Sequence, residues 1–277
     1  MSDGDGVEGY YRSGALLQRL EDALRDDGVD PSRPTLADLA PYDQFHGRGQ
    51  EATEQIAGQL PVAAGDRVLD VGSGFGGPAR YVAHRFGCHV TGIDLTAEFC
   101  ALARDLNARL GLQDRVDIHE GSALDLPFAD GAFDGAYSMN VSMNIADRAG
   151  LYGELFRVLK PGAWLLLSEI ARGESGTVLY PTPWAASEET SFLSTPAETR
   201  SDLEAAGFEV VRLESALEAT LDYGNRSREA VERGEKPPQR AVQLVHGAGA
   251  RKVAANTTRN MVSGAILPIE LFARRPR

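Results

Sequence analysis

Short apolar runs alternate with amphipathic segments along the chain after residue 66. The runs have the length of strands, and they lie at 67–71, 89–93, 116–120, 133–138, 163–169, 208–213 and 265–273. The segments between them have apolar residues at helical spacing, and they lie at 79–86, 97–110, 148–159 and 195–206. Because strands that alternate with helices form parallel sheets covered on both faces, the pattern predicts an α/β fold. We expect a mostly parallel, seven-stranded sheet flanked by helices.

The chain before the first strand has a helical pattern. Apolar residues recur at helical spacing over 14–25 and again over 49–60, and a proline-containing segment separates the two stretches. We therefore expect residues 1–60 to form an N-terminal helical cap and residues 61–277 to form the core domain.

Two long stretches interrupt the regular pattern of the core domain. Residues 171–194 are rich in Gly, Pro, Ser and Thr, whereas residues 214–262 are polar, largely helical in pattern and interrupted by Lys-Pro-Pro at 236–238. Long excursions inside compact domains usually serve a function. We interpret 171–194 as a lid on the substrate side and 214–262 as a C-terminal helical insertion on the same side.

The composition of the chain disfavours nucleic acid and membranes as binding partners. The net charge of -12 at pH 7 disfavours binding to nucleic acid or to an anionic membrane surface. No apolar run approaches the ~20 residues that cross a bilayer, and two cysteines are too few for a disulfide framework. We expect a cytoplasmic enzyme that acts on a small molecule, without a nucleic-acid or membrane partner. A homo-oligomer remains possible.

The turn after the first strand is rich in glycine. Residues 72–77 read GSGFGG, and Asp94 follows the second strand about twenty residues later. Such glycines let a ligand approach bare backbone, and an acid at the next strand tip can accept hydrogen bonds from both ribose hydroxyls. The same glycines satisfy a dinucleotide fingerprint, so a nicotinamide-dependent oxidoreductase is the alternative. Asp70, just before the turn, is unfavourable beside a diphosphate but tolerable beside an amine and a sulfonium.

Four motifs together carry a family resemblance. DVGSG at 70–74, Asp94, GSALDLPF at 121–128 and RVLKPG at 157–162 stand in the order and spacing of class I S-adenosylmethionine-dependent methyltransferases, which this chain resembles. The resemblance implies a Rossmann-like fold, S-adenosylmethionine as methyl donor and S-adenosylhomocysteine as product. The cofactor-binding residues that it implies are Asp70, Gly72, Ser73 and Gly74 at the methionine part, Asp94 and Leu95 at the ribose, and Ser122, Ala123 and Leu124 at the adenine.

The segment before the core extends the resemblance. Tyr10, Tyr11 and the PYDQFHGRG stretch around His46 are similar to a tyrosine pair and a His-to-Gly segment that cover the cofactor in sarcosine/dimethylglycine N-methyltransferase-like proteins. That group also holds natural-product methyltransferases. By this resemblance Tyr11 contacts the cofactor and the reacting centre, Tyr10 faces the substrate, and His46 hydrogen-bonds either of them. Packing of one tyrosine on the cap, and a supporting role for His46, stay open.

The ends of the fourth and fifth strands lie where open α/β sheets bind ligands. We expect Asn140 to contact the cofactor and the reacting centre and Asn144 to contact the substrate, with loop-stabilising hydrogen bonds as the alternative. Glu169 either positions an amine or accepts a proton there, or it pairs with a neighbouring arginine. The catalytic candidates are therefore Tyr11, His46, Asn140 and Glu169.

The remaining substrate candidates lie in the lid and the insertion. Tyr180, Trp184 and Phe192 form an aromatic loop that would close the site by excluding water, unless they build a small satellite core. Arg259 suits a carboxylate, although a solvated surface charge explains it equally well. No spacing among the five histidines and two cysteines indicates a metal site.

Methyl transfer from a sulfonium is an in-line displacement with an excellent leaving group, so it depends mainly on alignment and exclusion of water. Asparagines stand where a general base would be expected, which slightly favours an amine nitrogen as acceptor. O-methylation of a phenol and C-methylation of an isoprenoid remain alternatives.

Overall fold

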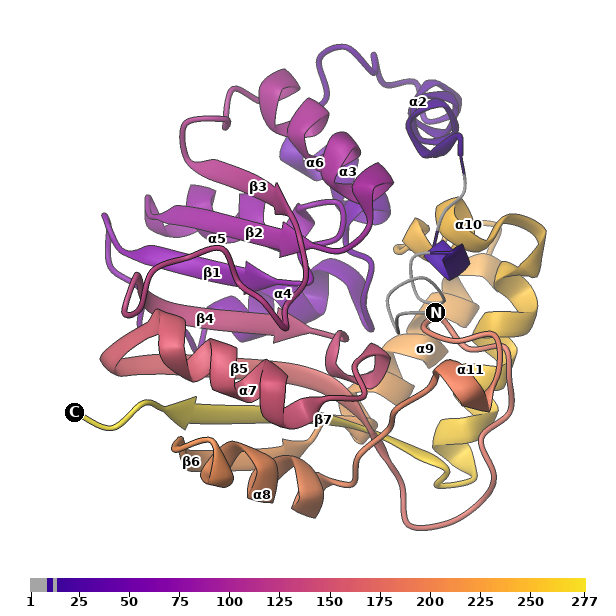
Figure 1. Ribbon diagram of the computed structural model, residues 1–277. Coiled ribbons are helices and arrows are strands. Elements are labelled where there is room, and N and C mark those ends of the chain that lie inside the picture. Colours follow the sequence, from indigo (N-terminus) through magenta and orange to yellow (C-terminus); the bar gives the residue numbers. More distant parts are fainter. Residues whose placement is uncertain (1–8, 12–13) are drawn as a thin grey trace.

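Seven strands form one sheet in the computed structural model, which describes residues 9–11 and 14–277. The strands are β1 (Arg67–Val71), β2 (His89–Asp94), β3 (Val116–Glu120), β4 (Phe133–Met139), β5 (Leu159–Arg172), β6 (Glu209–Ser215) and β7 (Ile266–Arg274). Their order in the sheet is β3-β2-β1-β4-β5-β7-β6. Only β7 pairs antiparallel with its neighbours, and the carboxyl ends of β1, β2 and β4 point to one edge (Figure 1). This confirms the predicted Rossmann-like, mostly parallel sheet.

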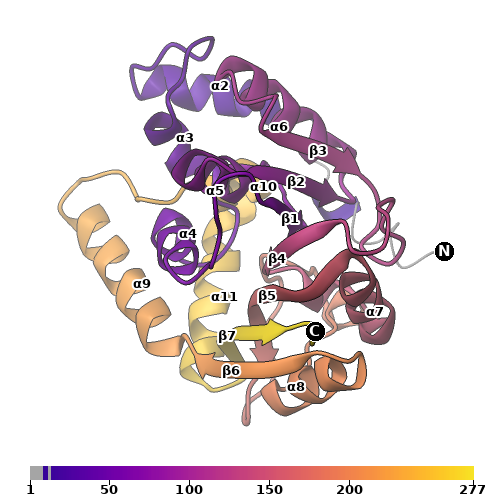
Figure 2. The ribbon, with the colours of Figure 1, turned by 90° about the vertical axis from the view of Figure 1, so that its left-hand side faces the viewer.

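Helices cover both faces of this sheet (Figure 2). One face carries α4 (Gly49–Ala57), α5 (Gly77–Phe86) and α6 (Ala97–Arg109), and the other carries α7 (Arg148–Val158) and α8 (Pro196–Ala205). Successive residues of β1 serve opposite faces, since Val68 packs with the first layer and Leu69 with the second. The apolar composition of these strands therefore follows from burial on both sides.

The remaining helices lie outside these two layers, several of them at the carboxyl edge of the strands (Figure 1). They are α2 (Leu16–Asp26), α3 (Leu36–Asp43), α9 (Leu217–Glu232), α10 (Ala241–His246) and α11 (Ala250–Val262), with single 3-10 turns at Ser142–Asn144, Glu188–Thr190 and Gly247–Gly249. Although far apart in sequence, α10 contacts α2 and α3. Leu16 of α2 and Leu244 of α10 belong to one apolar cluster, together with Phe75 and Phe99 of the core domain. The N-terminal segment and the insertion thus pack on each other.

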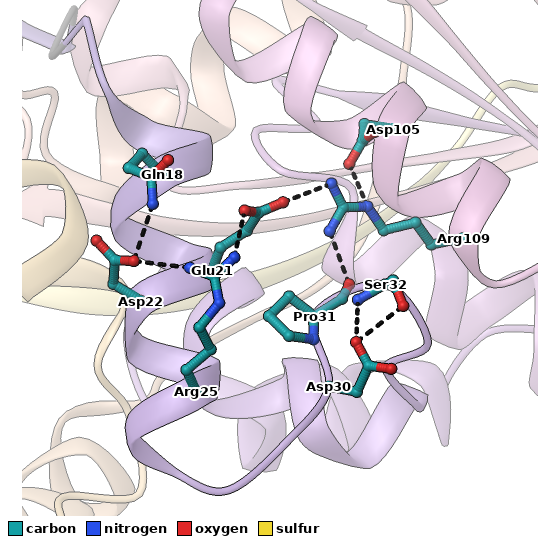
Figure 3. Close-up of polar contacts among 9 residues, drawn as sticks. All are labelled: Gln18, Glu21, Asp22, Arg25, Asp30, Pro31, Ser32, Asp105 and Arg109. Atoms are coloured by element: carbon teal, nitrogen blue, oxygen red, sulfur yellow. Dashed lines mark hydrogen bonds and ion pairs between the residues drawn. The ribbon is translucent and has the colours of Figure 1, made fainter.

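Helix α2 is tied to α6 by polar contacts (Figure 3). The guanidinium of Arg109 lies 2.9 Å from a carboxylate oxygen of Glu21 and 2.7 Å from one of Asp105, and it donates to the Pro31 carbonyl at 2.7 Å. Glu98 of α6 accepts hydrogen bonds from the backbone of Gly14 and Leu16 at 3.0 and 2.9 Å. These contacts fix the start and the middle of α2 on the core domain.

Helix α3 is absent from the sequence-based expectations. Pro41 inside it and the prolines before it argue against a helix. A complete capping box nevertheless starts it, because the Thr35 hydroxyl accepts from the Asp38 amide while the Asp38 carboxylate accepts from the Thr35 amide. Thr195 starts α8 in the same way, with Glu198 as its partner. In the described part of the chain no helix combines the length and apolarity needed to cross a membrane.

Candidate active site

A cavity of about 460 Å³ opens at the carboxyl edge of the sheet, between the strand ends and the covering helices. The turn after β1, the tip of β2 and the loop after β4 line its inner side, whereas α9, α10 and α11 line its outer side. This volume lies within the usual range for small-molecule sites.

The glycine turn shapes the inner wall. Gly72 has φ +72°, its amide donates to the Ile93 carbonyl at 2.8 Å, and a Cβ on it would lie 2.1 Å from a methyl carbon of Val141. Gly74 has φ +52°, and a Cβ on it would meet no atom within 4 Å. Gly72 is therefore required by packing, while the backbone at Gly74 faces open space that a ligand can fill.

Asp94 joins the tip of β2 to that turn. One oxygen of its carboxylate accepts the Gly74 amide at 2.8 Å, and the other accepts the Thr96 amide at 2.8 Å. Burial raises the pKa of this carboxyl, and the two amide bonds oppose that shift. Asp94 and Leu95 both line the cavity, and Ser122, Ala123 and Leu124 line it beside them.

Two predicted cofactor residues lie beneath the turn and not on the cavity wall. Asp70 is buried, and its carboxylate accepts the Tyr137 hydroxyl at 2.9 Å. Burial raises the pKa of Asp70 to about 7. The Ser73 side chain is also buried, where it packs toward Gly92. Neither side chain lines the cavity, because alternation along the strand and turn directs both into the protein.

The loop after β4 brings Asn140 and Asn144 to the cavity, as the sequence predicts. Asn140 adopts the left-handed conformation at φ 59°, and its amide donates to the Ser168 carbonyl at 2.7 Å. Glu169 does not line the cavity. Its buried carboxylate accepts the amides of Val141 and Ser142, each at 3.1 Å.

Glu169 thus acts on the loop after β4 and not on a ligand directly. Burial raises the pKa of its carboxyl to about 7, although the two amide bonds and nearby Arg148 favour the ionised form. Its contacts hold the backbone next to Asn140 in place.

The two tyrosines of the N-terminal segment have different positions. Tyr11 lines the cavity, its hydroxyl donates to the side-chain oxygen of Asn144 at 3.5 Å, and burial raises its pKa. Tyr10 does not line the cavity. Its hydroxyl donates to the Thr182 carbonyl at 2.6 Å and its ring lies 5.3 Å from that of His246. Tyr10 therefore ties the N-terminal segment to the segment 171–194.

His46 lines the cavity but has both ring nitrogens engaged. Nδ1 lies 3.1 Å from the Gly47 carbonyl oxygen, which can only accept, so Nδ1 carries the proton. Nε2 lies 3.1 Å from the Thr53 hydroxyl oxygen and 3.3 Å from the Gln44 side-chain oxygen, and the hydroxyl donates its proton to that Gln44 oxygen at 2.7 Å. Burial lowers the pKa of His46 to about 4, so the ring is neutral at pH 7.

Of the aromatic residues in the segment 171–194, only Trp184 lines the cavity. Its indole N–H donates to the Ser191 hydroxyl at 2.9 Å, and its ring packs with Met143 in a small apolar cluster that Tyr180 borders. Phe192 contributes its carbonyl to Arg148 at 2.6 Å. Trp184 thus reaches the cavity, whereas Tyr180 and Phe192 do not, and part of the segment forms the satellite core that was the alternative.

Arg259 is exposed on α11 and lies outside the cavity. Its neighbours Thr257 and Thr258 line the cavity instead, because successive side chains of a helix point about 100° apart around its axis. Asn256 and Asn260 hold the segment 171–194, donating to the carbonyls of Pro181 and Leu179 at 3.0 Å each.

Sequence reasoning missed the face of α9. Thr220, Tyr223 and Ser227 line the cavity at positions i, i+3 and i+7. The signal was a stripe of small and hydroxyl-bearing residues at helical spacing in a polar helix. It also missed Arg48, which lines the cavity and forms a buried ion pair with Glu270 of β7 at 2.9 Å.

Comparison with known proteins finds methyltransferases among the similar sequences. Residues 69–167 match a family model described as a methyltransferase domain. The glycine/sarcosine/dimethylglycine N-methyltransferase of Actinopolyspora halophila is 28% identical over 195 residues, which cover 70% of this chain and 34% of that protein. The matched parts span between 25% and 48% of the length of the curated relatives.

Two solved structures share nearly the whole fold. The [4+2]-cyclase SpnF is 25% identical with a TM-score of 0.66, over 95% of this chain and 94% of that one. A geranyl diphosphate methyltransferase is 18% identical with a TM-score of 0.74, over 99% of this chain and 100% of that one. These two structures show the fold, whereas the family model and the Actinopolyspora halophila relative support the methyltransferase prediction and not the nicotinamide alternative. Residues 69–167 thus match a methyltransferase domain, and the chain shares the Rossmann-like fold of its structural neighbours.

Proposed function

We propose that this protein transfers a methyl group from S-adenosylmethionine to a small-molecule acceptor by in-line displacement. The observation that carries the proposal is the bond between Asp94 and the Gly74 amide, at the lip of a cavity with open space beside Gly74. A carboxylate at a strand tip and bare backbone at the neighbouring turn suit a nucleoside with an amino-acid tail.

The residues present fit this cofactor. The turn at Gly72 and Gly74 would hold the methionine part, Asp94 the ribose hydroxyls, and Leu95 with the segment 122–124 the adenine. When bound, S-adenosylmethionine supplies an electrophilic methyl group on a positively charged sulfur. The protein's own part is to position the acceptor and to exclude water, with Tyr11 and Trp184 on the wall of the reaction space.

The described part of the cavity wall offers no available general base. The ring nitrogens of neutral His46 face Gly47, Thr53 and Gln44. Asp94 is bound to two amides, and Glu169 lies behind the wall. An acceptor that needs no deprotonation, such as a neutral nitrogen, is therefore favoured. C-methylation of an alkene is the main alternative, because it also needs no base before the methyl transfer. O-methylation fits only an acceptor that is already acidic.

The division of the chain is part of the proposal. We place a helical cap at 1–60, a core domain at 61–277, a lid at 171–194 and a substrate-side insertion at 214–262. The packing of α10 on α2 and α3 supports one joint cover made of cap and insertion. The free, buried Cys88 and Cys100 support a cytoplasmic location, and the net charge of -12 supports a partner other than nucleic acid.

Calorimetry with S-adenosylhomocysteine and, separately, with NAD tests the cofactor. We expect binding of the first only, and binding of NAD alone would overturn the proposal. Labelled S-adenosylmethionine with a panel of neutral amines, phenols and isoprenoids then tests the transfer. If the cofactor binds but no panel member or cell-extract small molecule gains label, the fold serves a reaction other than methyl transfer, and the structural similarity to a [4+2]-cyclase would then indicate where to look.

A further inference from the structure

Two helices of the insertion each turn one face to the cavity. From α9 these are Thr220, Tyr223 and Ser227, and from α11 they are Thr257, Thr258 and Met261. Residues at such spacings share one side of a helix. The two faces lie opposite the glycine turn and Asp94, so they line the part of the cavity that a bound cofactor would leave to the acceptor.

This acceptor compartment is apolar with hydroxyl groups. Its floor includes Met143 and Trp184, whose indole N–H is already satisfied by Ser191. The Thr220 and Thr257 hydroxyls donate to carbonyls of their own helices, at 2.7 and 2.8 Å. They therefore offer only lone pairs or methyl groups to a ligand.

The charged side chains on the cavity wall are already bound to partners within the protein. Among residues 9–11 and 14–277, the charged side chains on the cavity wall are Arg48 and Asp94, since His46 is neutral at pH 7. Asp94 lies on the cofactor side and is bound to two amides. Arg48 is buried, lies 2.9 Å from Glu270 and also donates to Gln55 at 2.6 Å. A charged acceptor would find no opposite charge left to pair with, and burying an unpaired charge is unfavourable.

We infer that the acceptor is uncharged at neutral pH, with a mainly apolar body that carries hydroxyl or carbonyl groups. This inference rests on the proposed function for the methyl transfer, and it narrows the acceptor class. It points away from zwitterionic amino acids and diphosphate esters, the kinds of compound named for two of the relatives. The reacting atom would be a weakly basic nitrogen or an alkene carbon.

A matched series of probes tests the charge preference. 12-Hydroxydodecanamide, 12-hydroxydodecanoate and 12-aminododecanol share one chain length and differ mainly in charge at pH 7. We expect the amide to bind at least about tenfold more tightly than either charged probe, measured by tryptophan fluorescence with and without S-adenosylhomocysteine. Tighter or equal binding of a charged probe, or binding of none of the three, overturns the inference.

The proposed function fails separately, by absence of S-adenosylhomocysteine binding in the same samples. A matched pair of variants locates the preference on α11. Thr258→Asp adds a negative charge to the cavity wall, whereas Ala255→Asp adds it to an exposed position of the same helix outside the cavity. We expect Thr258→Asp to improve binding of the aminoalcohol at least about fivefold and Ala255→Asp to leave it unchanged. The same effect in both variants, or in neither, overturns the assignment of this compartment.

Discussion

The Asp94 carboxylate organises the cavity before any cofactor arrives. It accepts one amide from the glycine turn and one from Thr96, and so it fixes the geometry between the ends of β1 and β2. An acid held in this way can accept ribose hydroxyls without first being ordered, which lowers the entropic cost of binding.

Replacing Asp94 by Asn should weaken binding of the cofactor. An amide group has one acceptor oxygen, so one of the two backbone N–H groups would face an NH2 group. We expect the affinity for S-adenosylhomocysteine to fall by on the order of 2 kcal/mol, about thirtyfold, with the fold retained. Calorimetry measures this loss, and Asp114→Asn, at an exposed position ahead of β3, is the control. Unchanged affinity in Asp94→Asn would show that this acid does not hold the ribose.

Glu169 should make stability depend on pH. Its folded pKa of about 7 lies above the ordinary value of 4.5, so between these values the folded state keeps a proton that the unfolded state has lost. Its contribution to stability is fully present below pH 4.5, falls as pH rises through 7, and amounts to on the order of 3 kcal/mol. Asp70 acts in the same direction.

The variant Glu169→Gln should therefore flatten the pH dependence only in part. Urea unfolding between pH 5 and pH 8 measures the free energy of unfolding at each pH, and the slope should be smaller than in the wild type. A slope equal to that of the wild type would mean that Glu169 is ionised throughout this range in the folded protein.

At the scale of elements, two of the three glycines in the turn between β1 and α5 have separate roles. Gly72 gives room to Val141 of the loop after β4, whereas Gly74 leaves room for a ligand. The turn thus connects the ends of β1, β2 and β4 to the cavity. The sequence alone does not distinguish Gly72 from Gly74, whereas their neighbours in the fold do.

Replacing Gly72 and Gly74 by alanine, one at a time, should separate the effect on stability from the effect on cofactor binding. Gly74→Ala should cost about 1–2 kcal/mol of stability for its positive φ and abolish cofactor binding. Gly72→Ala should cost more, because its Cβ also meets Val141, and Val141→Ala in the same chain should restore part of the loss. Thermal unfolding and calorimetry measure both properties. Equal destabilisation of the two single variants, without rescue, would argue against the contact with Val141.

At the scale of the whole molecule, residues far apart in sequence form one cover over the sheet edge. The cap rests on α6 through Arg109 and Glu98, and α10 of the insertion packs against the cap. Figure 1 shows both parts beside the ends of the strands. Access to the cavity therefore depends on contacts that lie away from it.

Loss of the Arg109 contacts should loosen this cover. Arg109→Met keeps the aliphatic stem but removes the links to Glu21, Asp105 and Pro31. We expect amide hydrogen exchange in Leu16–Asp26 to speed up by about fivefold, equivalent to ~1 kcal/mol, and cofactor affinity to fall less than in Asp94→Asn. Arg25→Met, on the exposed side of α2, is the control. Unchanged exchange would place the anchoring of α2 in its apolar contacts alone.

Local periodicity and motifs that are contiguous in the chain were enough to predict the sheet, the glycine turn, the position of Asp94 and the match of residues 69–167 to a methyltransferase domain. Strand boundaries agree with the prediction within a residue or two for β1 to β4. In contrast, β5 is longer at both ends, because Leu159 pairs with Phe133 of β4 and the pairing with β7 continues to Arg172. The folded arrangement was needed to show that Asp70, Ser73 and Glu169 face away from the cavity, since the direction of a side chain depends on its position in strand and turn. Folding also paired Arg48 with Glu270, 222 residues apart, and this long-range contact decides the charge of the acceptor compartment.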